Sequence, residues 1–285
     1  MKASETNTAT TGTLRVLDIG ALRGPLLVFG GVYSNLQALE RMMAIAEELG
    51  IPPAQIICTG DVVGYCADPE EVVQKVRDWG IHCIAGNVEL QLREGEEDCG
   101  CDFNDGSRCD IFSRQWYPYA QSVLSAEAIA WMHTLPHHLK FNYADRQAYV
   151  VHGAYDQVSG YVFASTPWEQ KAEQLAEVQA DMLLGGHCGL PFHSVQDDKY
   201  WLNPGVIGMP ANDATTRVWY MLLNDKDGLH FEHHSFEYDQ AEAARRMRAK
   251  RLPEAYALTL ETGLWDNCEI LPAEETALQG KAITF

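Results

Sequence analysis

Short apolar runs alternate with longer amphipathic stretches over the first part of the chain. The runs at 26–29, 56–59 and 81–85 have the length of buried strands, and each is followed by a glycine. Between the first two runs, the stretch 35–49 carries leucine, methionine and alanine at helical spacing, and Gly50 follows it. Strands that alternate with helices predict an α/β fold.

A second helix is predicted from the residues of its first turn. Asp68 can act as an N-cap, and Pro69 suits the first helical position. Two glutamates follow, where the positive end of the helix dipole favours acidic side chains. Gly80 then ends the helical pattern.

The chain changes character after residue 94. An acidic loop and then helices are expected up to about residue 142. Later, two alternating segments meet at the turn residues 224–228, and such a hairpin indicates mixed rather than purely parallel sheets. The other predicted elements are strands at 147–151, 182–184, 217–223 and 229–236, a helix at 239–250 and a short helix opened by Leu252-Pro253.

The same pattern divides the chain into three parts. Residues 1–24 are expected to form an N-terminal extension in which 14–22 adds an edge strand, and a Gly-Pro pair marks the entry to the main domain at 25–264. Residues 265–285 form a tail to which the pattern assigns no element.

Charge narrows the classes of partner. The chain of 285 residues has 40 Asp plus Glu against 21 Lys plus Arg, a formal net charge of -19. Such a surface repels phosphate backbones and anionic lipid, so we expect neither nucleic acid nor a membrane as the main partner. Residues 1–13 lack the basic and apolar regions of a signal peptide, and no apolar run approaches the roughly 20 residues of a transmembrane helix. We therefore expect a cytoplasmic protein with reduced cysteines.

Three of the eight cysteines cluster in the polar loop after residue 94. They are Cys99, Cys101 and Cys109. Because no second pair follows at zinc-finger spacing, a solvated insertion with free thiols is favoured over a structural zinc site.

Four strand ends carry the chemistry that stands out most. Each predicted strand finishes in a glycine next to a polar side chain, and these side chains are Asp61, Asn87, His152 and His187. Sites in open α/β sheets form at the carboxyl ends of strands, and glycine leaves room for a ligand there. One carboxylate, one amide and two imidazoles suit manganese, iron or zinc.

The order and neighbours of these residues resemble the calcineurin-like metallophosphoesterases, in particular a bacterial single-domain phosphodiesterase-like branch. The matching segments are GDVVGYCADP at 60–69, GNVE at 86–89, VHG at 151–153, GHCG at 186–189 and NPGVIGMP at 203–210. The resemblance implies a four-layer αββα sandwich of two mixed β-sheets flanked by helices. It also implies two metal sites and a hydroxide that attacks phosphorus between them.

The sequence departs from that family at one of the two metal sites. Gly31, Tyr33 and Gly189 stand where the resemblance places ligands of the first metal, whereas Asp61, Asn87, His152 and His187 match the ligands of the second. We therefore expect a single metal ion.

The general acid that the resemblance implies is also missing. Val88 stands at its position and can donate no proton, and a lost general acid typically costs roughly 100- to 10,000-fold in rate. The neighbouring Glu89 could serve as an acid, but a role at the helix start or facing solvent is favoured.

Several other side chains are candidates for the site. Tyr33 could ligate ferric iron as a phenolate, although filling of the vacated pocket is favoured. His193 could be a further ligand but is favoured as a strand residue, and Cys188 could be a thiolate or a buried small residue. Tyr65, which lies in the matching segment 60–69, and Asn35 are candidates for substrate binding.

Three hypotheses about function remain open on these residues. The first is a one-metal hydrolase that acts on a phosphate mono- or diester through a metal-activated water. The second is a pseudoenzyme that binds a metal and a small phosphorylated or anionic ligand without turnover. The third is an iron-dependent enzyme of altered chemistry that uses Tyr33.

Overall fold

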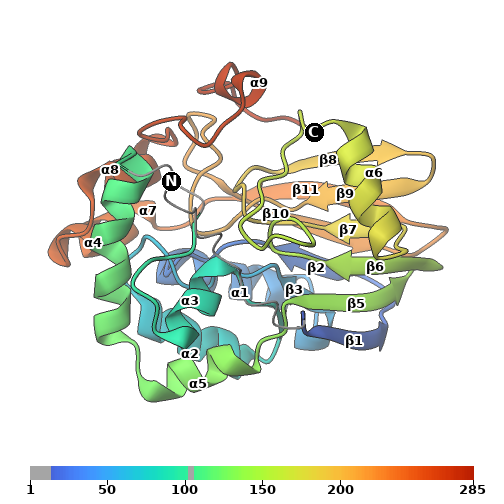
Figure 1. Cartoon of the computed structure of the whole chain (residues 1–285), viewed down its shortest axis with the longest axis horizontal. Coiled ribbons are helices and arrows are strands. Elements are labelled where there is room, and N and C mark those ends of the chain that lie inside the picture. The colour runs from blue at the N-terminus through green and yellow to red at the C-terminus, as the bar shows by residue number, and fades with distance from the viewer. Residues whose placement is uncertain (1–13, 102–105) are drawn as a thin grey trace, which may run out of the picture.

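The computed structural model describes residues 14–101 and 106–285, and it consists of two mixed β-sheets packed face to face between helices (Figure 1). The six-stranded sheet has the order β1 (Val16–Ala21), β5 (His138–Tyr143), β6 (Arg146–Val150), β7 (Met182–Leu184), β9 (Lys199–Asn203), β8 (Phe192–Gln196). The five-stranded sheet has the order β11 (His230–Phe236), β10 (Val218–Asn224), β2 (Leu26–Phe29), β3 (Ile56–Cys58), β4 (His82–Cys83). The predicted αββα sandwich is confirmed.

Helices cover the outer faces of both sheets. Those of the first half are α1 (Leu36–Glu48), α2 (Pro69–Trp79), α3 (Asn87–Glu94), α4 (Arg108–Val123) and α5 (Ala126–Thr134). Those of the second half are α6 (Trp168–Glu177), α7 (Gln240–Ala249), α8 (Glu254–Thr262) and the short α9 (Ala273–Thr276). Figure 1 shows α6 lying over the six-stranded sheet, away from the other long helices.

The alternation of side chains in β2 explains how the layers hold together. Leu26 and Val28 pack into the core between the two sheets, whereas Leu27 and Phe29 pack into the core under α1 and α2. Successive side chains of a strand point to opposite faces, so a fully apolar strand buries both. All four residues are 0% exposed, as expected for a central strand.

Most predicted elements occur where the pattern placed them. The edge strand expected at 14–22 is β1, which pairs in parallel with β5. Asn35 caps α1 by accepting a hydrogen bond from the Ala38 amide, and Gly80 ends α2 with a φ of 72°. Asp68 is the N-cap of α2 as predicted, but its side chain makes no capping bond. Its carboxylate instead accepts hydrogen bonds from the Arg246 guanidinium at 2.8 and 3.0 Å.

The C-terminal tail, to which the sequence assigned no element, packs against the main domain. The Trp265 amide donates to Asn212 Oδ1 at 2.8 Å, and the Arg217 guanidinium donates to the Ile283 carbonyl at 2.6 Å. The ring of Phe285 stacks on that of His233 with 3.9 Å between centroids. The tail therefore contributes side chains to the surface of the domain near the strand ends.

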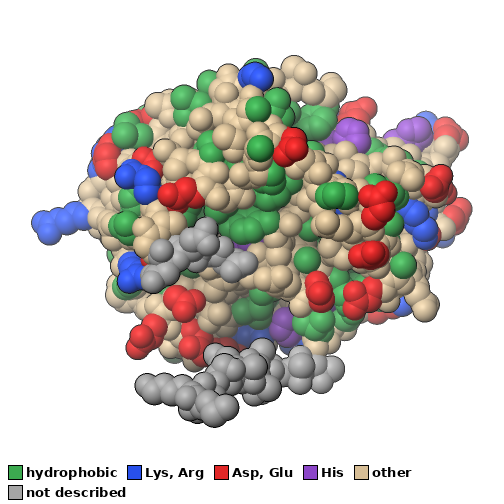
Figure 2. All heavy atoms as spheres, turned by 45° about the horizontal axis from the view of Figure 1, so that its top comes forward, with side chains coloured by type: hydrophobic (Ala, Val, Ile, Leu, Met, Phe, Trp, Pro, Cys, Tyr) green, Lys and Arg blue, Asp and Glu red, His purple; other side chains and the backbone are tan. Residues whose placement is uncertain are grey.

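The surface carries the negative charge that the composition predicts. Figure 2 shows acidic side chains spread over one face, with basic ones mainly towards its margins. Among the described residues, no helix is long and apolar enough to cross a membrane. The expectation that residues 1–13 are not a signal peptide concerns residues outside the described ranges.

Candidate metal centre

Two strands of each sheet end at the same edge of the sandwich. Asp61 follows β3 and Asn87 opens α3 after β4, both from the five-stranded sheet. His152 follows β6 and His187 follows β7 in the six-stranded sheet. Asp61, Asn87 and His152 are buried, and His187 is partly buried. The structure therefore brings together the four side chains that the strand-end pattern singled out.

The donor atoms of these side chains are spaced as ligands of one ion would be. His152 Nε2 lies 3.2 Å from Asp61 Oδ2, 3.1 Å from Asn87 Oδ1 and 3.1 Å from His187 Nδ1. Around an ion with bonds of about 2.1 Å, neighbouring donors lie roughly 3.0 to 3.4 Å apart. Asp61, His152 and His187 by themselves form a candidate metal-binding group, with ligand atoms within 4.8 Å of one another. The residues present thus fit a transition metal.

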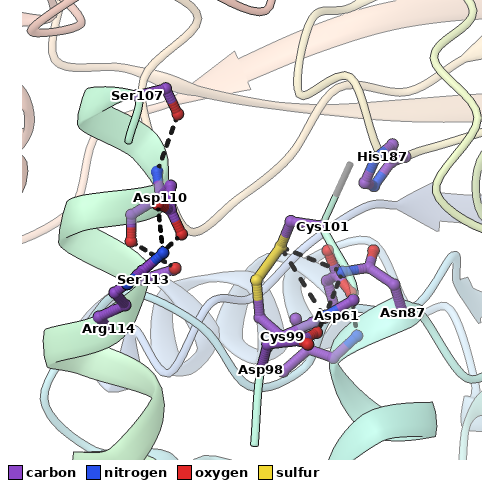
Figure 3. Close-up of a disulfide and its surroundings, with 12 residues drawn as sticks. Asp61, Asn87, Asp98, Cys99, Cys101, Ser107, Asp110, Ser113, Arg114 and His187 are labelled. Atoms are coloured by element: carbon purple, nitrogen blue, oxygen red, sulfur yellow. Dashed lines mark hydrogen bonds and ion pairs between the residues drawn. A yellow bond between two sulfur atoms is a disulfide. The ribbon is translucent and has the colours of Figure 1, made fainter. Parts of the chain in front are cut away.

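Hydrogen bonds behind the ligands orient them towards the centre. His152 Nδ1 donates to the Thr59 carbonyl at 2.7 Å, which leaves Nε2 to face the other donors. Asn87 Nδ2 donates to the Cys99 carbonyl at 2.9 Å, so that Oδ1 turns towards His152. Figure 3 shows the Asn87 side chain pointing towards Cys99 and Cys101, to which dashed lines connect it.

Burial favours the neutral form of both histidines, but the neighbouring side chains shift their pKa values in different directions. Burial disfavours the charged form of His152, but the adjacent Asp61 carboxylate outweighs it and raises the pKa of His152. Burial, followed by the repulsion from His152, lowers the pKa of His187 to about 3. The Asp61 carboxylate therefore favours the charged form of His152, whereas His187 is neutral at neutral pH.

Glu89 organises the loops that carry two of the ligands. Its carboxylate, which is 0% exposed, accepts hydrogen bonds at 2.9 Å from the amides of Asp61, Val63 and Gly86. Burial, followed by the charge of Asp61, raises the pKa of Glu89 to about 7. The expected helix-start role is correct, but Glu89 does not face solvent. Its position three residues after Gly86 is a capping-box spacing that could have indicated these bonds.

Gly60 and Gly86 are required for the close approach of these loops. A Cβ at Gly86 would overlap Asp61 Oδ1, and one at Gly60 would lie 2.9 Å from His152 Nδ1. Gly60 also has a φ of 95°, which favours glycine. The glycines next to the ligands therefore mark positions where no side chain fits.

Aromatic side chains stand next to the two glycines that replace expected ligands. A Cβ on Gly31 would lie 2.9 Å from Tyr33 Oη and closer still to its ring, so the phenol fills the space of a side chain at position 31. A Cβ on Gly189 would lie 3.5 Å from Trp265 Cζ2. The pocket-filling interpretation of Tyr33 is supported, and the part played by Trp265 was not foreseen because the tail gave no pattern.

Two of the remaining candidate residues, His193 and Cys188, pack within the fold. His193 lies in β8 with its ring against those of Phe231 and His233, away from the ligands. Cys188 is buried, and burial raises the pKa of its thiol to about 12. Tyr65, in contrast, lines a cavity beside His187.

Asn35, a candidate for substrate binding, is occupied by internal bonds. Besides capping α1, it donates through Nδ2 to the Gly208 carbonyl at 3.0 Å and to Tyr238 Oη at 2.9 Å. Asn35 therefore leaves no group free for a ligand.

Val88, at the position where the resemblance implies a general acid, is apolar and 2% exposed.

The expectation of free thiols in the loop after α3 is wrong for one pair. Cys99 and Cys101 form a disulfide, because the turn between them brings their Cα atoms to 5.4 Å, within the usual range for such a bond (Figure 3). Cys109 lies apart in α4, and its thiol contacts Asn267 Oδ1 at 3.7 Å. Among the described residues these cysteines form no metal-binding group.

Comparison with known proteins agrees with this fold. The model of the calcineurin-like phosphoesterase superfamily domain matches residues 26–227. The chain is 25% identical over 252 residues to uncharacterized protein MJ0912 of Methanocaldococcus jannaschii, covering 82% of this chain and 96% of that protein.

Two solved structures share the fold. A metallophosphoesterase from Sphaerobacter thermophilus is 23% identical with a TM-score of 0.65, over 85% of this chain and 100% of that one. Hypothetical protein PH1004 from Pyrococcus horikoshii is 19% identical with a TM-score of 0.72, over 85% and 99%. Because the family model spans more than half of the chain, the protein belongs to the calcineurin-like phosphoesterase superfamily.

Proposed function

We propose that this protein holds one transition metal ion through Asp61, Asn87, His152 and His187 and hydrolyses a phosphate mono- or diester. The observation that carries the proposal is the position of His152 Nε2, within 3.2 Å of a donor atom from each of the other three residues. Manganese, iron and zinc all accept such a mixed oxygen and nitrogen set. The ligand is a small phosphorylated compound.

The chain's own residues define what the site can do. A bound metal would supply Lewis acidity and lower the pKa of a water ligand. Glu89 and Thr59 orient Asp61 and His152 through the hydrogen bonds described above. Val88 offers no proton to a leaving group, so the proposed substrates are esters whose leaving groups depart without protonation.

A second candidate function is metal-dependent binding without turnover. It is favoured by Val88, which is apolar and 2% exposed at the position where the family resemblance implies an acid. The iron-dependent alternative is not carried forward. Burial, followed by the charge of Asp61, raises the pKa of Tyr33 well above its ordinary value and disfavours the phenolate.

Metal analysis of protein purified without chelator tests the single site. We expect about one equivalent of metal per chain, because the proposed donors converge on one point. The variant His152→Ala should lose this metal, whereas the control His193→Ala, in β8, should keep it. Two equivalents per chain would overturn the proposed stoichiometry.

Turnover of an activated aryl phosphate then separates the two candidate functions. Such a substrate needs little help from a general acid, so the position of Val88 does not bias the result. Hydrolysis that is lost in Asp61→Ala and kept in His193→Ala supports the enzyme. Metal-loaded protein that binds phosphate but turns over neither mono- nor diesters supports binding alone.

A further inference from the structure

A cavity of about 80 Å³ adjoins the candidate metal centre, with His187 as part of its wall. Tyrosines from three separate segments line it: Tyr33 after β2, Tyr65 in the loop after β3, and Tyr256 in α8. Trp265 of the tail and Gly189 complete the side towards the six-stranded sheet. The cavity therefore lies where a ligand of the centre would extend.

The three tyrosine rings are held in place by packing against one another. The rings of Tyr33 and Tyr65 meet edge to face at 4.8 Å between centroids, and those of Tyr65 and Tyr256 at 4.7 Å. Gly31 and Gly64 have no side chains, which leaves room for the ring of Tyr33. Ring packing thus fixes the hydroxyls without the help of hydrogen bonds.

The hydroxyls of these tyrosines have no hydrogen-bond partner among the residues that the structure describes. Tyr33 is only 5% exposed, so its hydroxyl has little access to solvent outside the cavity. None of the three oxygens is among the fully buried atoms without a partner, so each hydroxyl keeps some accessible surface, as expected for residues that line a cavity. Elsewhere in the protein, the tyrosines with such partners include Tyr117, Tyr119 and Tyr143, each of which donates to a backbone carbonyl.

The charges around the cavity indicate what the hydroxyls would bind. Asp266, the carboxylate in its wall, is paired with the Arg108 guanidinium at 2.8 Å. The Thr259 hydroxyl donates to the Ala255 carbonyl, and the Trp265 indole N–H donates to the Pro210 carbonyl. The groups that remain are the three phenols and His187 Nε2, which is buried without a hydrogen-bond partner among the described residues. At neutral pH the phenols are hydrogen-bond donors. Donors beside a cation site complement an oxyanion and leave an apolar ligand unmatched.

We propose that Tyr33, Tyr65 and Tyr256 form an oxyanion subsite whose hydroxyls donate hydrogen bonds to the oxygens of a phosphoryl group held at the metal centre. The proposal rests on the proposed metal binding. It adds a second set of contacts to the ligand, from neutral donors in an aromatic pocket. These residues act by binding the ligand, and they do not hold the metal.

Titration of metal-loaded protein with inorganic phosphate tests the subsite. Each of Tyr33→Phe, Tyr65→Phe and Tyr256→Phe keeps the ring packing and removes one hydroxyl. We expect each to weaken phosphate binding about 10-fold, the usual effect of losing a hydrogen bond to a charged group. The matched control is Tyr200→Phe, whose hydroxyl donates to the exposed Asp198.

Metal titration of the same variants distinguishes failure of the subsite from failure of the metal centre. Metal affinity should be unchanged in all three, since none of the hydroxyls is a proposed ligand. If the unaltered protein binds no metal, the proposed function is contradicted. Phosphate affinity that is equal in the three variants and the unaltered protein, or no phosphate binding at all, overturns the subsite whatever the metal titration gives.

Discussion

At the residue scale, Asp61 depends on its neighbour Glu89 for its position. Asp61 has a φ of 54°, in the left-handed region that side chains other than glycine rarely adopt. Its amide donates to Glu89, which also binds the amides of Val63 and Gly86. One buried carboxylate therefore holds the loops that contribute both Asp61 and Asn87 to the centre.

We predict that Glu89→Gln destabilises the protein and weakens metal binding. The glutamine amide brings N–H donors to a place where three backbone N–H groups already point. Leaving such groups unpaired should cost about 2 kcal/mol in the free energy of unfolding, measured by urea denaturation. Metal affinity should fall by about 10-fold, since orienting residues typically have effects of that size.

The exposed Glu47 provides the control for this substitution. Glu47→Gln should leave both the urea midpoint and the metal affinity unchanged, because no buried donor depends on it. A Glu89→Gln protein with the stability and metal affinity of the unaltered chain would show that the three hydrogen bonds do not position Asp61.

At the scale of elements, the loop after α3 contacts the candidate metal centre through Asn87. The Cys99 carbonyl accepts the Asn87 side-chain amide at 2.9 Å, and Cys101 Sγ lies 3.2 Å from the same nitrogen (Figure 3). The disulfide closes only a short loop, so it adds little to global stability through chain entropy. Its effect is expected at Asn87, the proposed metal ligand that the disulfide contacts.

We predict that the double variant Cys99→Ser/Cys101→Ser binds metal about 10-fold more weakly, because an orienting contact of a ligand is loosened. Calorimetric titration measures the affinity. Cys268→Ser, which alters a free thiol in the tail, is the control and should bind metal normally. Equal affinity in the double variant and the control would show that the bridge does not hold Asn87.

The sequence predicted elements well where a local pattern sets them. Apolar runs followed by glycine gave β2, β3 and β7, and the strand-end positions gave the side chains that come together at the candidate metal centre. Contacts between distant segments left no such pattern. The approach of Trp265 to Gly189 and the hydrogen bond from Arg246 to Asp68 depend on tertiary packing, which local propensity cannot predict.

At the scale of the whole molecule, the candidate centre links the two sheets. Asp61 and Asn87 come from the five-stranded sheet, and His152 and His187 from the six-stranded sheet. A ligand that binds the folded state but not the unfolded chain stabilises the fold by mass action. Metal bound to residues of both sheets would therefore stabilise the packing of the two sheets against each other.

We predict that metal raises the melting temperature and that the rise is larger at pH 8 than at pH 6. Metal at 100 times its dissociation constant stabilises by about 2.7 kcal/mol, or roughly 5 °C or more for a chain of this size. The pKa of His152 is raised in the folded metal-free protein. Its charged form therefore stabilises that protein at low pH, and this contribution is lost as pH rises through the raised pKa.

The proton on His152 must also leave before metal binds, so affinity falls as pH falls. Both effects make the gain larger at high pH, and scanning calorimetry with and without chelator measures it. His152→Ala should show no gain at either pH. A gain that grows towards acid pH would contradict the assignment of His152 as a ligand.

The packing of Tyr33 against Gly31 also has a consequence for how this sequence can evolve. An aspartate introduced at position 31 alone would collide with the phenol, because even its Cβ would lie within 2.9 Å of Tyr33 Oη. Position 33 would have to change to a smaller side chain before, or together with, position 31. Substitutions at positions 31 and 33 are therefore expected to be coupled, because a side chain at position 31 needs the space that the Tyr33 ring fills.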